Sequence, residues 1–128
     1  MKFARRVFLV AGVYGLLVLL PQYFMEGRIG RDLPPPITHP EHFYGFIGLA
    51  VVFQLLFFLI AGDPVRYRPV MWIAVLEKLS FGVPVIILFL LGRIAPPVLA
   101  GGLIDLLLAV LFAFSLRATP RSTSTNAS

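Results

Sequence analysis

Three charged residues occur inside apolar segments that are long enough to cross a membrane. Glu77 and Lys78 lie together in one such segment, and Asp105 lies in the next. A charged side chain at the depth of the hydrocarbon costs about 2.5–3.5 kcal/mol on insertion scales, so such residues usually face the interior of a helix bundle. Carboxylates and an ammonium in that setting form ion pairs, exchange protons or bind a polar ligand. These three residues are therefore the first candidates for a functional site.

Two further polar side chains fall at a similar depth. A helix rises about 1.5 Å per residue. On that count four polar groups lie about 10–12 Å from the cytoplasmic ends of their segments, namely Tyr14, Gln54, Glu77 and Lys78, and Asp105 lies about 18 Å deep. Each segment thus offers a polar group in the inner half of the membrane or near its middle. We predict that the five residues form one cluster, which is our candidate ligand or proton site.

Lys78 has two predicted arrangements. Adjacent helical residues point about 100° apart, so Glu77 and Lys78 face different neighbours. Lys78 either extends to the membrane interface or reaches Asp105 across the hairpin of the last two segments. In the second case Glu77 faces Gln54, Tyr14 or the arginines of the inner loop, which joins the second and third apolar segments. The alternative to a functional role is a structural one, in which the ion pairs fix the register of the helices.

The elements that position these residues are four apolar segments. A membrane-spanning helix needs about 20 residues to cross about 30 Å of hydrocarbon, and the segments cover residues 7–25, 43–62, 70–92 and 94–116. The chain is 59% hydrophobic and 13% charged, whereas a soluble domain carries about 25% charged residues. We predict an all-α fold, an integral membrane four-helix bundle in residues 1–118, followed by a disordered polar tail in residues 119–128.

The distribution of lysine and arginine predicts the orientation in the membrane. One side holds Lys2, Arg5, Arg6, Arg66, Arg68, Arg117 and Arg121, and the other holds Arg28, Arg31 and Arg93. Cytoplasmic loops carry an excess of these residues. We therefore expect both the N- and the C-terminus to be cytoplasmic, in a multi-pass protein of the cytoplasmic membrane.

Helix packing is predicted from small residues and loop lengths. Small residues let membrane helices approach closely, and three helix faces carry them: Gly12 and Gly15 on the first segment, Gly45 and Gly48 on the second, and Gly101 and Ala109 around Asp105 on the fourth. The loops after the second and third segments are short. Short loops join adjacent antiparallel helices, so we expect the second, third and fourth helices to be neighbours.

Several kinds of chemistry are excluded or unsupported by the sequence. The chain has no cysteine, which excludes disulfides, thiol redox chemistry and thiolate metal sites. Its basic residues stand at the ends of apolar segments and not in one patch, so we expect no nucleic-acid partner. The sequence contains neither a phosphate-binding glycine loop nor a nucleophile elbow. We assign no catalytic residue, and the sequence does not identify a cofactor.

His39 and His42 are weak candidates for a metal site on the outer side. Two imidazoles three residues apart can bind one ion on a helix, but the sequence offers no evident third ligand. The alternative is that they mark the start of the second helix, with Pro40 in its first turn. We predict no metal site.

Two stretches resemble a known family. The stretch His42-Phe43-Tyr44-Gly45-Phe46-Ile47-Gly48 and the block Leu76-Glu77-Lys78-Leu79-Ser80-Phe81-Gly82, together with the four-span layout, resemble small bacterial four-helix membrane proteins of the broad DoxX-like type. The resemblance covers residues 43–116. It implies a four-helix bundle and, in some members, a membrane subunit of a quinone-linked redox system. It transfers no site residue position by position.

Three functions are compatible with these observations. The first, which we favour, is a non-catalytic accessory subunit or module that binds a lipid, a quinone or a protein partner within the bilayer, as a homo-oligomer or in a larger membrane complex. The second is a proton-coupled transporter of small molecules that works as a dimer. The third is a lipid-modifying enzyme, in which Glu77 moves a proton together with Tyr14 or Asp105.

Overall fold

All elements in the described part of the chain are helical. The computed structural model describes residues 2–121 of the 128. In chain order the elements are α1 (Lys2–Leu19), η1 (Leu20–Phe24), α2 (Glu26–Asp32), α3 (Pro40–Gly62), η2 (Arg68–Val70), α4 (Met71–Leu90) and α5 (Pro96–Ala118). Four helical stretches of 23 residues, with mean hydropathies of 1.9 to 2.4, are long and apolar enough to cross a membrane. The protein is therefore an all-α, multi-pass membrane protein, as the four apolar segments predict.

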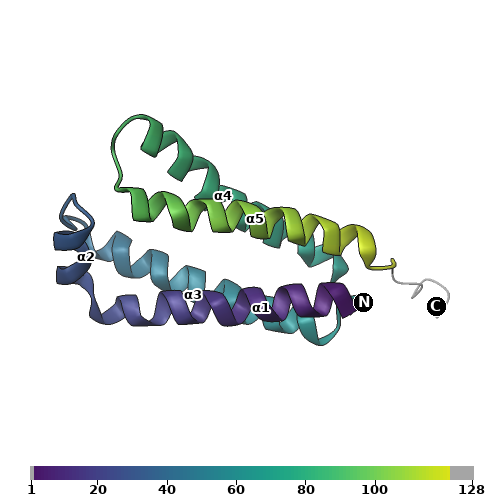
Figure 1. The fold of residues 1–128 in the computed structure, drawn as a ribbon. Helices are drawn as coiled ribbons and strands as arrows, with labels where there is room; N and C mark the ends of the chain where they lie inside the picture. The colour runs from purple at the N-terminus through teal and green to yellow at the C-terminus, as the bar shows by residue number, and fades with distance from the viewer. Residues whose placement is uncertain (1, 122–128) are drawn as a thin grey trace.

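The four long helices form two antiparallel pairs (Figure 1). α1 packs along α3, α4 packs along α5, and contacts between α1 and α5 join the two pairs. Both described termini lie at the same end of the bundle, which we call the terminal end, and α2 lies at the opposite, distal end. The order around the bundle is thus α3, α1, α5, α4.

The expected packing of α3 against α4 is wrong. The two helices are joined by a short loop, yet they share few contacts, and α4 runs away from α3 toward the distal end in Figure 1. A short loop holds only the adjoining helix ends together and leaves the rest of each helix free to diverge. The loosely closed seam between α3 and α4 is therefore a feature that loop length does not predict.

The helix boundaries are set by proline and glycine. The first helix begins at Lys2, earlier than the predicted residue 7, and changes to a 3₁₀-helix at Leu20. Pro21 follows at once, and it has no N–H to continue the α-helical ladder. α5 begins at Pro96, where the missing N–H costs nothing. Before it, Gly92 adopts a φ of 70° in the turn after α4, a conformation that glycine tolerates.

The distal connection, which joins the first two apolar segments, contains a short helix, α2, that the four predicted segments do not include. Glu26 lies in the first turn of this short helix and Arg31 in the last, as the helix dipole favours. Arg28 and Asp32 form an exposed ion pair of 3.5 Å one turn apart. α2 covers the distal end of the bundle beside η1.

The end of α5 is held in place by side-chain hydrogen bonds. Thr119, the first residue of the predicted disordered tail, takes part in them. Arg68 donates its Nε–H to the carbonyl oxygens of Leu116 and Thr119, at 3.2 and 2.8 Å. Thr119 is buried, and its hydroxyl donates to the carbonyl of Ser115. Basic side chains commonly satisfy the last carbonyls of a helix in this way. Residues 122–128 of the predicted tail lie outside the described residues.

Glycines let the two helices of the second pair approach closely. A Cβ at Gly82 would lie 2.7 Å from the Leu106 side chain, and one at Gly102 would lie 2.5 Å from Val85. The sequence analysis assigned this role to Gly101, but a Cβ there would meet nothing within 4 Å. Adjacent helical residues point about 100° apart, so a shift of one position moves the small residue from the helix interface to another face.

Gly102→Leu is expected to force α4 and α5 apart. Overpacking of a closely packed interface typically costs about 1–3 kcal/mol, and here the obstacle is the β-branched Val85, which cannot bend away. We expect the free energy of unfolding in detergent to fall by that amount. Gly101→Leu, which differs by one position, should leave it unchanged or raise it slightly, because glycine is a poor helix former. Equal loss in both variants would contradict the assigned helix interface.

Candidate functional site

A cavity of about 510 Å³ lies between the two helix pairs. It is lined by side chains of every helix longer than three residues, from α1 and η1 through α2 at the distal end to α5. Its size falls within the range of about 300–1,000 Å³ that is usual for small-molecule sites. The weak contact between α3 and α4 leaves this space unfilled by helix packing.

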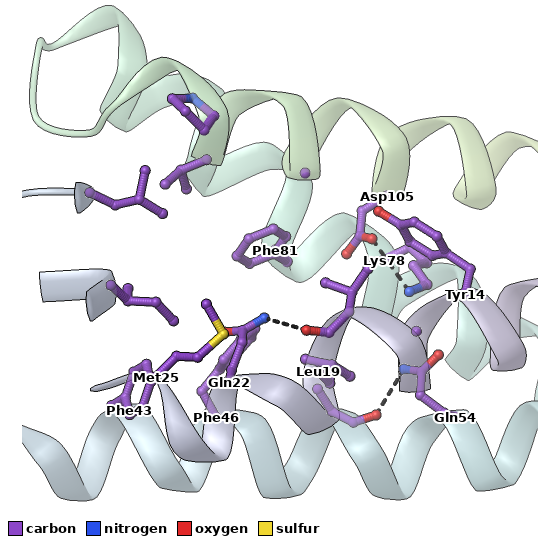
Figure 2. A pocket seen from close by; sticks show the side chains of 18 of the residues that line it. Tyr14, Leu19, Gln22, Met25, Phe43, Phe46, Gln54, Lys78, Phe81 and Asp105 are labelled. Atoms are coloured by element: carbon purple, nitrogen blue, oxygen red, sulfur yellow. Dashed lines mark hydrogen bonds and ion pairs between the residues drawn. The ribbon is translucent and has the colours of Figure 1, made fainter. Parts of the chain in front are cut away.

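The deep end of the cavity is polar, and all five sequence-predicted candidates line it: Tyr14, Gln54, Glu77, Lys78 and Asp105. We call these five residues the polar floor. They come from α1, α3, α4 and α5, so each long helix contributes at least one group. Figure 2 shows four of them, all except Glu77, at one end of the cavity. The predicted cluster of polar residues at one depth is thus brought together in space.

Lys78 lies at the centre of the floor between two carboxylates. Its Nζ donates a hydrogen bond to Oδ1 of Asp105 at 3.4 Å and lies 3.7 Å from Oε2 of Glu77. The lysine side chain is 4% exposed, and the two acids are 15% and 14% exposed. Of the two arrangements expected for Lys78, the structure has the one that reaches Asp105.

The expected partners of Glu77 are corrected by this geometry. Gln54, Tyr14 and the inner-loop arginines do not bind its carboxylate, and its nearest cation is Lys78 beside it. The two Cβ atoms point in different directions, but the long lysine stem brings the ammonium back between both acids. The floor therefore holds two carboxylates and one ammonium, a formal charge of −1.

Gln54 is buried with one polar atom unsatisfied. Its Nε2 donates to the carbonyl of Ala50 at 2.8 Å, which fixes the orientation of the amide because a carbonyl can only accept. The side chain is 1% exposed, and Oε1 has no hydrogen-bond partner among residues 2–121. The carboxamide fits directly against Gly15, where a Cβ would overlap it. Glycine in α1 thus makes room for an amide whose acceptor is unpaired.

A second buried acceptor is also unpaired. Oε2 of Glu77 has no hydrogen bond within the described chain, since its 3.7 Å separation from Lys78 is too long for one. Buried polar atoms without partners are rare in folded proteins, and each needs an explanation such as a missing ligand or water. Both unpaired atoms of the floor are oxygens that accept.

The walls between the polar floor and the distal end are apolar. Leu19, Met25, Phe43, Phe46 and Phe81 line them, as Figure 2 shows. The amide of Gln22 also lies on this wall, but its Nε2 donates to the carbonyl of Val18 in its own helix. An apolar channel therefore leads to a polar end that lies within the membrane-spanning helices.

Gly101 is the wall residue whose role the sequence analysis misjudged. It lines the cavity, and the space in front of its Cα is open. The sequence did carry a signal for this position, because Gly101 precedes Asp105 by four residues and so shares its helix face. That face points into the cavity and not at a neighbouring helix.

Three aromatic rings close the bundle on the terminal side of the floor. Phe8, Phe57 and Phe112 are fully buried; the rings of Phe8 and Phe112 stack at 4.2 Å, and that of Phe57 meets Phe112 edge-on at 5.0 Å. The ammonium of Lys78 lies 5.2 Å from the Phe57 ring, within the range of a cation–π contact. We call these three residues the aromatic plug.

His39 and His42 lie apart from the cavity, at the start of α3. Their rings stack at 4.9 Å, and Nδ1 of His39 lies 3.2 Å from Oε1 of Glu41. All three side chains are exposed. The backbone carbonyl of His39 accepts the N–H groups of His42 and Phe43, so this segment begins the helix. Potential ligand atoms of His39, Glu41 and His42 lie within 4.8 Å of one another, so Glu41 is a third group that the sequence analysis did not count.

The arrangement suits a molecule with two unlike ends. The apolar walls accommodate a hydrocarbon chain or ring, and the floor offers charged and hydrogen-bonding groups to a polar end. Comparison of the chain with known protein families, with curated proteins and with solved structures gives no match.

Proposed function

We propose that this protein is a non-catalytic module of the bacterial cytoplasmic membrane that binds one amphipathic molecule, a lipid or a quinone. The polar end of the ligand lies on the polar floor and its apolar part lies along the walls. The protein serves as an accessory subunit or carrier for that molecule. The observation that carries the proposal is a cavity of about 510 Å³ with apolar walls and a polar floor, enclosed by helices that can cross a membrane.

The seam between α3 and α4 supports exchange of the ligand with the bilayer. These neighbours share few contacts, whereas the other neighbouring pairs around the bundle pack more extensively. A ligand from the lipid phase can enter between them without breaking a packed interface. The aromatic plug closes the opposite direction, toward the terminal end.

The orientation belongs to the proposal. Both described ends of the chain lie at one end of the bundle, and that end carries seven of the lysines and arginines outside the hydrocarbon, against three at the other. The excess of positive charge marks the cytoplasmic side. The cavity then opens toward the outer leaflet, and its ligand comes from there.

Native mass spectrometry of protein released gently from membranes tests the proposal. We expect wild type to carry a discrete bound mass and Gly101→Leu to lose most of it. Gly101 lines the cavity and a Cβ there would meet nothing within 4 Å, so a leucine side chain at this position extends into the space of the ligand. Glu77→Gln, which changes the floor, should also lower the occupancy.

Gly45→Leu is the matched control for this experiment. Gly45, like Gly101, is helical and has no neighbour within 4 Å of an added Cβ, but it does not line the cavity. This variant should keep the bound mass. A bare wild-type protein, or equal occupancy in wild type and Gly101→Leu, would contradict the proposed binding site.

A further inference from the structure

We infer that the polar end of the ligand is a cationic hydrogen-bond donor, an ammonium group, which binds to the carboxylates of Glu77 and Asp105 on the polar floor. The inference rests on the proposed function, because it names the chemical class of the ligand that the cavity binds. It follows from the balance of donors, acceptors and charge on the floor.

Hydrogen-bond acceptors exceed donors on the floor. Each carboxylate of Glu77 and Asp105 offers about four lone-pair sites, whereas Lys78 supplies three N–H groups in all. Lys78 makes one hydrogen bond to this pair, to Asp105. The unpaired buried atoms of the cluster are Oε2 of Glu77 and Oε1 of Gln54, among the residues that the structure describes. Both acids line the cavity and keep part of their side-chain surface exposed. A ligand that brings N–H groups can donate to these carboxylates, whereas a ligand that brings only acceptors cannot.

The charge balance points the same way. Two carboxylates face one ammonium, and both acids keep 14–15% of their side-chain surface exposed. A charged side chain inside a membrane protein costs free energy unless an opposite charge pairs with it. A second ammonium gives the floor two carboxylates and two ammonium groups, so that each charge has a partner. An anionic head group, such as a carboxylate or a phosphate, would raise the formal charge from −1 to −2 or beyond.

Lys78 lies so that part of the surface of both acids stays accessible to a ligand. Its side chain is 4% exposed, and its ammonium lies 5.2 Å from the centre of the Phe57 ring. The lysine thus neutralises the floor from the side of the aromatic plug. The surface that remains for a ligand is formed by the acids and by the apolar walls.

Four probes with one tail and different head groups test the inference. Dodecylamine carries a positive charge and N–H donors, whereas dodecanol carries only a neutral O–H donor. Dodecyltrimethylammonium carries a positive charge without hydrogen-bond donors, and dodecanoate carries a negative charge. Each is titrated into wild-type protein in phosphatidylcholine nanodiscs, with empty nanodiscs to correct for partition into the lipid. Occupancy is read by native mass spectrometry.

Dodecylamine is expected to bind most tightly. Hydrogen bonds to charged groups are worth enough to change affinity by about 10-fold or more, so dodecanol and dodecyltrimethylammonium should each bind about 10-fold more weakly. Dodecanoate should bind at least about 100-fold more weakly, because it loses both contributions.

Two variants assign the selectivity to the carboxylates. Glu77→Gln and Asp105→Asn keep the shape of the side chains and remove the charge. Each should lower the affinity for dodecylamine by about 10-fold or more and change the affinity for dodecanol by less than about threefold. Ser115→Ala is the control, because this buried hydroxyl donates to Leu111 in its own helix and does not line the cavity. It should leave both affinities unchanged.

The possible results separate the inference from the proposed function. Dodecanoate binding as tightly as dodecylamine would overturn the inference and leave a general amphiphile site. Unchanged amine affinity in both carboxylate variants would also overturn it. Absence of binding by all four probes to wild type would overturn the proposed function as well.

Discussion

Lys78→Met is expected to lower the free energy of unfolding by about 3–5 kcal/mol, the usual cost of removing one partner from a buried ion pair. Lys78 is the cation within reach of both floor carboxylates, at 3.4 Å from Asp105 and 3.7 Å from Glu77. Methionine fills nearly the same volume but carries no charge. The variant therefore leaves two like charges together in a mostly buried place, where they repel each other and lack water.

The loss should be largely reversed when the acids are neutralised too. The triple variant Glu77→Gln, Lys78→Met and Asp105→Asn contains no charge on the floor, and neutral replacement of a buried ion pair is often harmless or stabilising. We expect its stability to lie within about 1–2 kcal/mol of wild type. It should bind dodecylamine no better than dodecanol, because the charge that selects the amine is gone.

Equilibrium unfolding in mixed micelles, followed by circular dichroism as sodium dodecyl sulfate is added, measures these changes. Arg93→Met is the matched control, since Arg93 is exposed in the turn before α5, and exposed substitutions usually change stability by less than about 0.5 kcal/mol. If Lys78→Met were as stable as Arg93→Met, the acids would have another source of compensation, and the lysine would not be what holds the floor together.

The depth of the polar groups could be predicted from the sequence because helix rise is nearly constant. Counting residues from the predicted cytoplasmic end of each apolar segment put Tyr14, Gln54, Glu77 and Lys78 at one level, and all four line the same cavity with Asp105. Membrane-spanning helices start and end near fixed planes, so position along the chain converts directly into depth. This is why the cluster was found without knowledge of the packing.

Helix neighbours and helix rotation were not predictable in the same way. The short loop between α3 and α4 joins two helices that diverge, because a loop constrains only their ends. Gly101 and Gly102 differ by one position, yet one faces the cavity and the other packs on Val85. A rotation of about 100° per residue decides which small residue lies at an interface. Hydropathy does not record this rotation when a helix is apolar all round.

The short helix α2 was missed for a different reason. Its seven residues include Gly27 and Gly30, which are poor helix formers, and isolated helices of this length are marginal in water. It lies against η1 and the distal end of the bundle, so tertiary contacts favour its helical form. Local sequence alone therefore indicates a loop, and only the packed structure reveals the helix beside the cavity.

Phe112→Ala is the second substitution with a large expected effect. Phe112 is fully buried and contacts the rings of Phe8 on α1 and Phe57 on α3, so it joins α5 to the other helix pair. The two pairs are held together chiefly by α1 and α5. Truncation of a buried phenylalanine typically costs about 3–5 kcal/mol. In a membrane the side chain of the unfolded protein lies in lipid and not in water. The free energy lost on truncation therefore comes mainly from lost van der Waals contacts.

We therefore expect Phe112→Ala to lower the free energy of unfolding by about 3 kcal/mol, the lower end of that range. Phe112→Met, which roughly conserves the volume, should cost less than about 1.5 kcal/mol. The matched control is Phe114→Ala on the same helix, where the ring is 53% exposed and its removal should change stability by less than about 0.5 kcal/mol. The same titration with sodium dodecyl sulfate measures all three. Equal effects of Phe112→Ala and Phe114→Ala would mean that the aromatic plug does not join the two helix pairs, and the cavity between them would then lack a fixed inner end.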